Sequence, residues 1–162
     1  MINEIRIIMA RDLRAFAREI ELFPDDELVW KTPTGISNSA GNLALHACGN
    51  LQHFIGHELG GTDYIRDREH EFGARAGARA DLVREIQTTC DVVELTLNDF
   101  PASSLDLPFP QPVLGVTLPT RTFLLHLTAH LAFHLGQAGY LRRVLTGDAT
   151  TAGSMSPREL GA

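Results

Sequence analysis

The sequence contains little cysteine, lysine or tryptophan, and these shortages exclude several classes of protein. Its two cysteines, Cys48 and Cys90, form no Cys-x-x-Cys motif and are too few for a disulfide framework. Lys31 is the only lysine, and the net charge of −6 argues against nucleic acid as a partner. No apolar run can span a bilayer, and charges interrupt the apolar pattern at the N-terminus, unlike in a signal peptide. We therefore expect a cytoplasmic, reduced protein with no nucleic-acid or membrane partner.

What the sequence does contain is the composition of an ordinary globular domain. Hydrophobic residues make up 44% and charged residues 21% of its 162 residues, which suits one substantial core. The prediction is a single domain over residues 1–147. Residues 148–162 are small and polar, so a flexible C-terminal tail is expected there.

Four stretches repeat apolar residues at the spacing of an amphipathic helix, over residues 2–23, 40–59, 81–100 and 120–146. Ser37, Asn38 and Ser39 offer N-caps for the second stretch. Thr120 offers one for the fourth, and Gly147 follows the fourth as a helix stop. Residues 62–77 read as a polar surface crossover, and a proline-bearing stretch precedes the fourth helix. With no convincing strand, the pattern predicts an all-α fold, a four-helix bundle with long crossover connections.

The fourth stretch carries an unusual pattern, a histidine at every fourth residue: His126, His130 and His134. Histidines four residues apart lie on one face of a helix, about 6 Å apart along its axis, and can share a metal ion. His126 and His134 are roughly 12 Å apart along the axis, so one ion cannot bind both. At most one adjacent pair therefore serves a single site.

The second stretch has a matching polar stripe, formed by His46, Asn50, His53 and His57 on one side of the helix. Two histidines from one helix and one from another make the three-nitrogen set of a catalytic zinc site, which leaves a position open for water or substrate. Imidazole also suits nickel, copper or ferrous iron, so these residues alone do not name the metal.

Simpler interpretations apply to several of these residues. A lone histidine on an apolar helix face is usually a core or rim residue, and His53 and His57 are expected to be solvated near the helix end. The charged run Arg66 to Glu69 is expected to be solvated surface, and both cysteines are expected to be packed thiols. Two known metal schemes are excluded: Leu131 follows His130 where a metalloprotease needs glutamate, and no histidine follows a glutamate by three residues, as di-iron bundles require.

Two segments resemble the DinB/YfiT-like superfamily. The last predicted helix, HLTAHLAFHLGQAGYLRRVL, is similar to the superfamily's final helix, in which two histidines four residues apart precede Gly-Gln; here these are His130, His134, Gly136 and Gln137. The stretch NSAGNLALHACGNLQHFIG resembles the superfamily's second helix, and His46 stands at its single ligand position. The segment RDREHEF, residues 66–72, is similar to one subgroup of small DinB-like proteins of unassigned activity.

The resemblance implies a four-helix bundle in which His46, His130 and His134 hold a divalent metal, most often zinc or nickel. It also implies a metal-dependent enzyme that acts on a small-molecule substrate, since characterised relatives include transferases and isomerases that use a low-molecular-weight thiol as cosubstrate. Asn50, His126 and Gln137 are then candidates to support the ligands or bind substrate. A metal-dependent hydrolase and a non-catalytic metal-binding bundle are the alternatives.

Two further expectations concern surfaces. The connections after the first and third long helices carry Trp30 and Phe109, which are suitable for an apolar rim around the mouth of the site. In the first helix, Ile7, Ile8 and Met9 are adjacent, so part of that helix is expected to lie outside the core. An exposed apolar strip usually binds a partner, so a homodimer is expected, as the resemblance also suggests.

Overall fold

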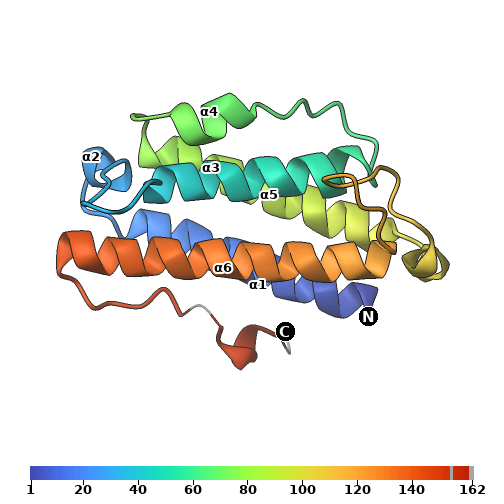
Figure 1. The fold of residues 1–162 in the computed structure, drawn as a ribbon. Helices are drawn as coiled ribbons and strands as arrows, with labels where there is room; N and C mark the ends of the chain where they lie inside the picture. Colours follow the sequence, from blue (N-terminus) through green and yellow to red (C-terminus); the bar gives the residue numbers. More distant parts are fainter. Residues whose placement is uncertain (154, 161–162) are drawn as a thin grey trace.

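The computed structural model describes residues 1–153 and 155–160, and these form a bundle of helices (Figure 1). The α-helices are α1 (Ile2–Glu21), α2 (Asp26–Val29), α3 (Ala40–Leu51), α4 (Arg68–Gly73), α5 (Arg79–Asp99) and α6 (Thr120–Thr146). Shorter helical turns are η1 (Gln52–His57), η2 (Ala102–Asp106) and η3 (Pro157–Leu160). Within the described ranges there is no named strand, so the all-α prediction is confirmed.

The four long helices α1, α3, α5 and α6 make the bundle, with α1 against α5 and α6, and α3 against α5 and α6. Its centre is a continuous apolar cluster to which all four helices contribute, including Phe16, Leu51, Ile86 and Leu124, each almost fully buried. Met9 of α1 lies inside this core and Ile7 and Ile8 are partly buried, so α1 does not present the exposed apolar strip expected of it.

The helix ends follow local chemistry. Ser39 begins α3 with a capping box, in which its hydroxyl accepts from the Asn42 backbone N–H and the Asn42 side chain accepts from the Ser39 backbone N–H. Gly147 ends α6 with a φ of 69°, the left-handed conformation that glycine adopts freely. The predicted cap at Thr120 is wrong: Pro119 holds that position, and the Thr120 hydroxyl donates to the Leu107 carbonyl.

The second long helix differs from its prediction. The α-helix ends at Leu51 and the chain continues in η1 as a π-helix, whose wider turn holds more residues. Beyond Leu51 the side chains therefore leave the faces that an ideal α-helix assigns them, and the polar stripe that begins at His46 is broken.

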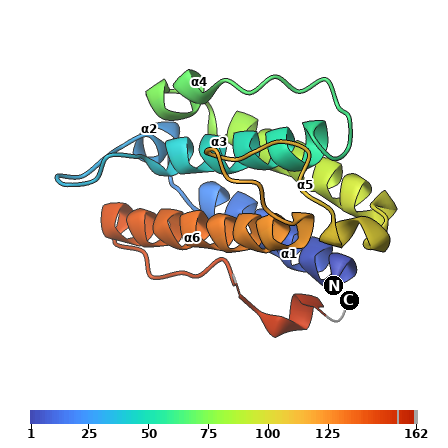
Figure 2. The ribbon, with the colours of Figure 1, turned by 45° about the vertical axis from the view of Figure 1, so that its right-hand side comes forward.

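The long crossover after η1 is not irregular throughout. Its α4 lies along the outer side of α3 (Figures 1 and 2) and packs directly on that helix. The described part of residues 148–160, where a flexible tail is expected, runs back beside α1 (Figure 2). Arg18 of α1 donates to the Ala152 carbonyl and pairs with Glu159.

Across the described residues, no helix combines the length and the apolar character that crossing a membrane requires.

Candidate metal centre

The bundle brings three histidines from two helices together. His46 lies on α3, and His130 and His134 lie one turn apart on α6. The Nε2 atom of His130 is 3.3 Å from Nε2 of His46 and 3.0 Å from Nε2 of His134. One ring nitrogen from each histidine lies within 4.8 Å of the others, so the three rings converge on a common point.

These separations suit a shared metal ion. Zinc binds histidine nitrogen at about 2.0–2.1 Å, so two ligands at the tetrahedral angle are about 3.3 Å apart. The distances of 3.3 Å and 3.0 Å from His130 to the other two rings are close to that value, and all three ligand atoms lie within 4.8 Å of one another. His46 is buried while His130 and His134 are partly exposed, which leaves one side of the cluster open toward solvent. A three-histidine cluster with this geometry could bind a divalent metal.

The hydrogen bonds behind two of the rings set their tautomers. His46 Nδ1 lies 2.8 Å from Oε2 of Glu71, and because an ionised carboxylate only accepts, Nδ1 carries the proton. His134 Nδ1 lies 2.8 Å from Oε1 of Gln137, which likewise accepts. Both rings therefore direct an unprotonated Nε2 at the common point. His130 can donate to only one of these lone pairs, whereas a cation at the centre satisfies all three.

Glu71 also binds Arg66, in a two-point ion pair with distances of 2.7 Å to Oε1 and 2.9 Å to Oε2. Burial acts to raise the pKa of Glu71, but the hydrogen bonds from His46 and Arg66 outweigh it and hold that pKa below its ordinary value. Arg66 Nη2 is also 3.3 Å from His46 Nδ1, a contact that follows from both groups donating to the same oxygen. The carboxylate therefore stays ionised and orients His46.

The sequence patterns do not identify Glu71 as a functional residue. The expectation that the charged run Arg66 to Glu69 is solvated surface is wrong for Arg66. Arg66 is 14% exposed and Glu71 is 4% exposed, because α4 folds this segment onto α3. Asp67 caps α4 by accepting from the His70 backbone N–H. The signal that could have identified this element is that cap, followed by a short amphipathic stretch within the charged segment.

The cluster histidines resist protonation. Burial, reinforced by the neighbouring His134, His46, His126 and Arg66, lowers the pKa of His130 to about 4. Burial also lowers the pKa of His134, although its hydrogen bond to Gln137 acts in the opposite direction. Neutral imidazole is the form that binds metal, so both rings are ready to act as ligands at neutral pH.

The remaining candidates divide into those near the cluster and those outside it. His126 is exposed and stacks on His130, with ring centroids 6.0 Å apart. Asn50 is buried one turn beyond His46, and among the described residues its Oδ1 has no hydrogen-bond partner. His53 instead contacts Gln111, and His57 donates to the Thr62 carbonyl, because the π-helix turns both away from the cluster.

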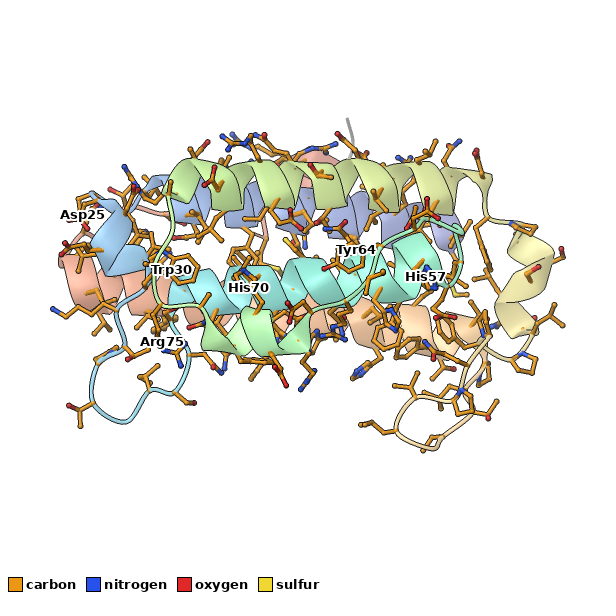
Figure 3. The ribbon with its side chains drawn as sticks, turned by 90° about the horizontal axis from the view of Figure 1, so that it is seen from above. Asp25, Trp30, His57, Tyr64, His70 and Arg75 are labelled. Atoms are coloured by element: carbon orange, nitrogen blue, oxygen red, sulfur yellow. The ribbon has the colours of Figure 1, made fainter. Side chains whose placement is uncertain are left out.

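The predicted apolar rim does not form from Trp30 and Phe109, which are both buried. Figure 3 shows Trp30 beside α2, at the beginning of α3, where the indole donates to the Gly77 carbonyl. Phe109 packs edge-on against Phe123 with ring centroids 4.6 Å apart. Both side chains pack the connections that follow α1 and α5 against the bundle, so neither is available to a ligand.

A cleft of about 520 Å³ lies instead between the connection 33–38 and the C-terminal half of α6. Gln137 belongs to its wall and also contacts His134, so the cleft opens beside the histidine cluster.

The all-helical bundle and its partly open three-histidine cluster define the class: a helical protein with a candidate metal centre between two helices. Comparison with known families places the chain within that class: residues 9–138 match the DinB superfamily, and the protein belongs to this superfamily. No curated protein matches the chain.

Proposed function

We propose that the protein is a metal-dependent enzyme that binds one divalent ion, zinc or nickel, through His46, His130 and His134, and transfers a low-molecular-weight thiol to an electrophile or uses it in an isomerisation. The observation that carries this proposal is the convergence of three Nε2 atoms on a partly open point, with Glu71 and Gln137 behind two of the rings. A site intended only for stability would be closed by further protein ligands.

A divalent ion in such a site lowers the pKa of a thiol that reaches its open position. Residues of the chain orient the ligands and accept the proton. Glu71 and Gln137 keep His46 and His134 in the ligating tautomer. His126, exposed beside His130, accepts the thiol proton. The sulfur then forms a bond to the electrophilic carbon while the bond to the leaving group breaks with its electron pair.

The thiol must come from outside the chain. Burial raises the pKa of Cys48 to about 12 and that of Cys90 to about 11, and both side chains are buried. Neither is near enough to its thiolate form at neutral pH to act as a nucleophile, so a diffusible thiol is the remaining source of sulfur.

Hydrolysis is the second candidate, because the position of His126 suits it equally. An exposed imidazole stacked on a ligand histidine is suitably placed to accept a proton from water as well as from a thiol. Water would then take the place of the thiol, and the same residues would support the attack.

Metal analysis of the purified protein and two variants tests the site. About one divalent ion per chain is expected, because three ligands complete one site. His130→Ala should lose most of the metal, whereas His126→Ala, which alters the same helix one turn away, should retain it. Full metal content in both His46→Ala and His130→Ala would disprove the assignment.

Cobalt substitution separates the two reactions. If a thiol binds the ion, adding a cellular thiol to the cobalt-loaded protein should produce a thiolate charge-transfer band and a calorimetric binding signal. If neither appears with any of the common cellular thiols, the transferase proposal fails, and metal-dependent hydrolysis and a non-catalytic metal-binding bundle are left.

A further inference from the structure

The cleft beside the histidine cluster has an unusual chemical character, because none of the residues that line it carries a charge. Its walls are mainly apolar, formed by Pro33, Ile36, Leu43, Tyr140, Leu141 and Val144. The polar groups among them are neutral: Thr34, Ser37, Asn38 and Gln137. In a protein with 21% charged residues, a cleft lined only by uncharged side chains disfavours ions, which lose hydration there. The Arg143 guanidinium lies outside this lining, with its Cζ 6.0 Å from the centroid of the Tyr140 ring.

Two neighbouring helices connect the cleft to the cluster. Leu43 lies one turn before His46 on α3, and Gln137 lies one turn after His134 on α6. Gln137 contributes to the cleft wall while its Oε1 accepts from His134 Nδ1 at 2.8 Å. From His134, α6 continues along the cleft to Val144, about 15 Å further along the helix axis. A molecule that fills the cleft therefore has one end beside the candidate metal site.

We propose that this cleft binds the uncharged, apolar body of the electrophilic substrate, with its reactive end directed toward the three histidines. This inference rests on the proposed function. It assigns the acceptor, and not the thiol, to the cleft: the low-molecular-weight thiols of cells carry charged groups, for which the cleft offers no partner. The neutral amide of Gln137 and the side chains of Ser37 and Asn38 provide hydrogen bonds for one neutral polar group on the acceptor.

The first test compares three probes of the same ring size by methyl NMR: benzamide, benzoate and benzylamine. Benzamide should shift the methyl resonances of Ile36, Leu43 and Val144. Benzoate and benzylammonium should bind at least about tenfold more weakly, because their charges lose hydration in the cleft. Equal binding of benzoate, or benzamide shifts confined to other methyl groups, would overturn the proposal.

Substitutions at the exposed ends of the cleft provide the second test. Ile36 is 49% exposed and Val144 is 69% exposed, so an aspartate at either position is compatible with folding. Ile36→Asp and Val144→Asp should each weaken benzamide binding about tenfold or more. Leu95→Asp, at a helix position that is 68% exposed and outside the cleft, is the matched control and should bind benzamide normally. Unchanged benzamide binding in both cleft variants would count against the cleft as the acceptor site. A change in the molecular mass of either variant by light scattering would also count against it, because it would identify the cleft as an interface between copies.

The position of the probe relative to the ion gives the third test. Bound benzamide should show pseudocontact shifts in the cobalt-loaded protein and none in the zinc-loaded protein. Metal content, measured in the same samples, should be unaltered by Ile36→Asp and Val144→Asp. If the protein bound metal and thiol but benzamide bound elsewhere, this inference would fail and the proposed function would stand. If benzamide bound in the cleft but the protein took up no metal, the proposed metal-dependent function would fail, and with it the assignment of the cleft to an electrophilic substrate.

Discussion

Glu71 is the residue on which the orientation of His46 depends. Its carboxylate accepts from His46 Nδ1 and from Nε and Nη2 of Arg66, with only 4% of the side chain exposed. A carboxylate behind a ligand histidine fixes the ring and raises its basicity toward the metal. In the proposed metal site, Glu71 would therefore stabilise the ion from the far side of the His46 ring.

We expect Glu71→Gln to lower metal affinity by about 10- to 100-fold, the usual effect of removing such a partner. Competition with a chromophoric chelator measures the change. Glu69→Gln is the matched control, because Glu69 is exposed on the same helix and should leave affinity unaltered. Equal affinities for the two variants would show that Glu71 serves only to attach α4.

The low pKa of His130 predicts a pH dependence of the metal-free fold. The folded pKa is about 4 and the unfolded value is 6.5, so between these values the unfolded chain binds more protons. The contribution of His130 to the free energy of unfolding should therefore decrease as the pH falls from about 6.5 to about 4.

The measurement is denaturant unfolding of metal-free wild type and His130→Asn near pH 5 and near pH 7.5. The stability of the wild type relative to the variant should be lower at about pH 5 than at about pH 7.5. A pH-independent difference would show that His130 is solvated in the metal-free state.

At the scale of elements, the contact between α3 and α4 decides whether Glu71 reaches the site. Gly49 of α3 allows this approach: a Cβ there would lie 2.2 Å from Oε1 of Glu71 and 3.3 Å from the Tyr64 hydroxyl. Figure 3 shows Tyr64 on the connection that passes over α3. The side of α3 that faces α4 must therefore lack a side chain at residue 49.

Gly49→Ala should displace Glu71 and lower metal affinity about as much as Glu71→Gln, roughly 10- to 100-fold. Gly136→Ala on α6 is the matched glycine change: a Cβ there meets no atom within 4 Å, so it should raise helix stability by roughly 0.5–1 kcal/mol. Chelator competition and denaturant unfolding distinguish the two outcomes. Wild-type metal affinity in Gly49→Ala would contradict the proposed role of this contact.

At the scale of the whole molecule, a stripe of exposed apolar side chains lies on the first half of α6, and not on α1, where the sequence predicts one. Leu125 and Phe133 are 50% and 60% exposed and share one side of the helix with the small residue Ala129 between them. Large side chains that alternate with small ones suit the packing of a second helix. We propose that this stripe, and not Ile7 and Ile8, forms the homodimer contact.

Light scattering at micromolar concentration should therefore report a dimer, and Phe133→Asp should convert it to a monomer because it places a charge within the contact. Leu95→Asp, an equally exposed position on α5, should remain dimeric. A wild-type monomer would disprove the dimer, and an unaltered Phe133→Asp dimer would place its contact elsewhere.

The sequence by itself determined the features that depend on residues close together in the chain. The bounds of α6 were predicted as residues 120–146 because helical periodicity and the stop at Gly147 are local signals. The same spacing places His130, His134 and Gln137 on one face of that helix, where the structure has them in contact.

Only the tertiary structure decided the features that require distant segments to meet. Glu71 is 25 residues from His46 and reaches it only because α4 packs on α3 at Gly49, which has no side chain. The π-helix removes His53 and His57 from the cluster, although an ideal helix would align them with His46. The cleft joins a loop near residue 35 to a helix about a hundred residues later. Helical spacing describes one helix at a time, whereas these contacts depend on how the whole bundle packs.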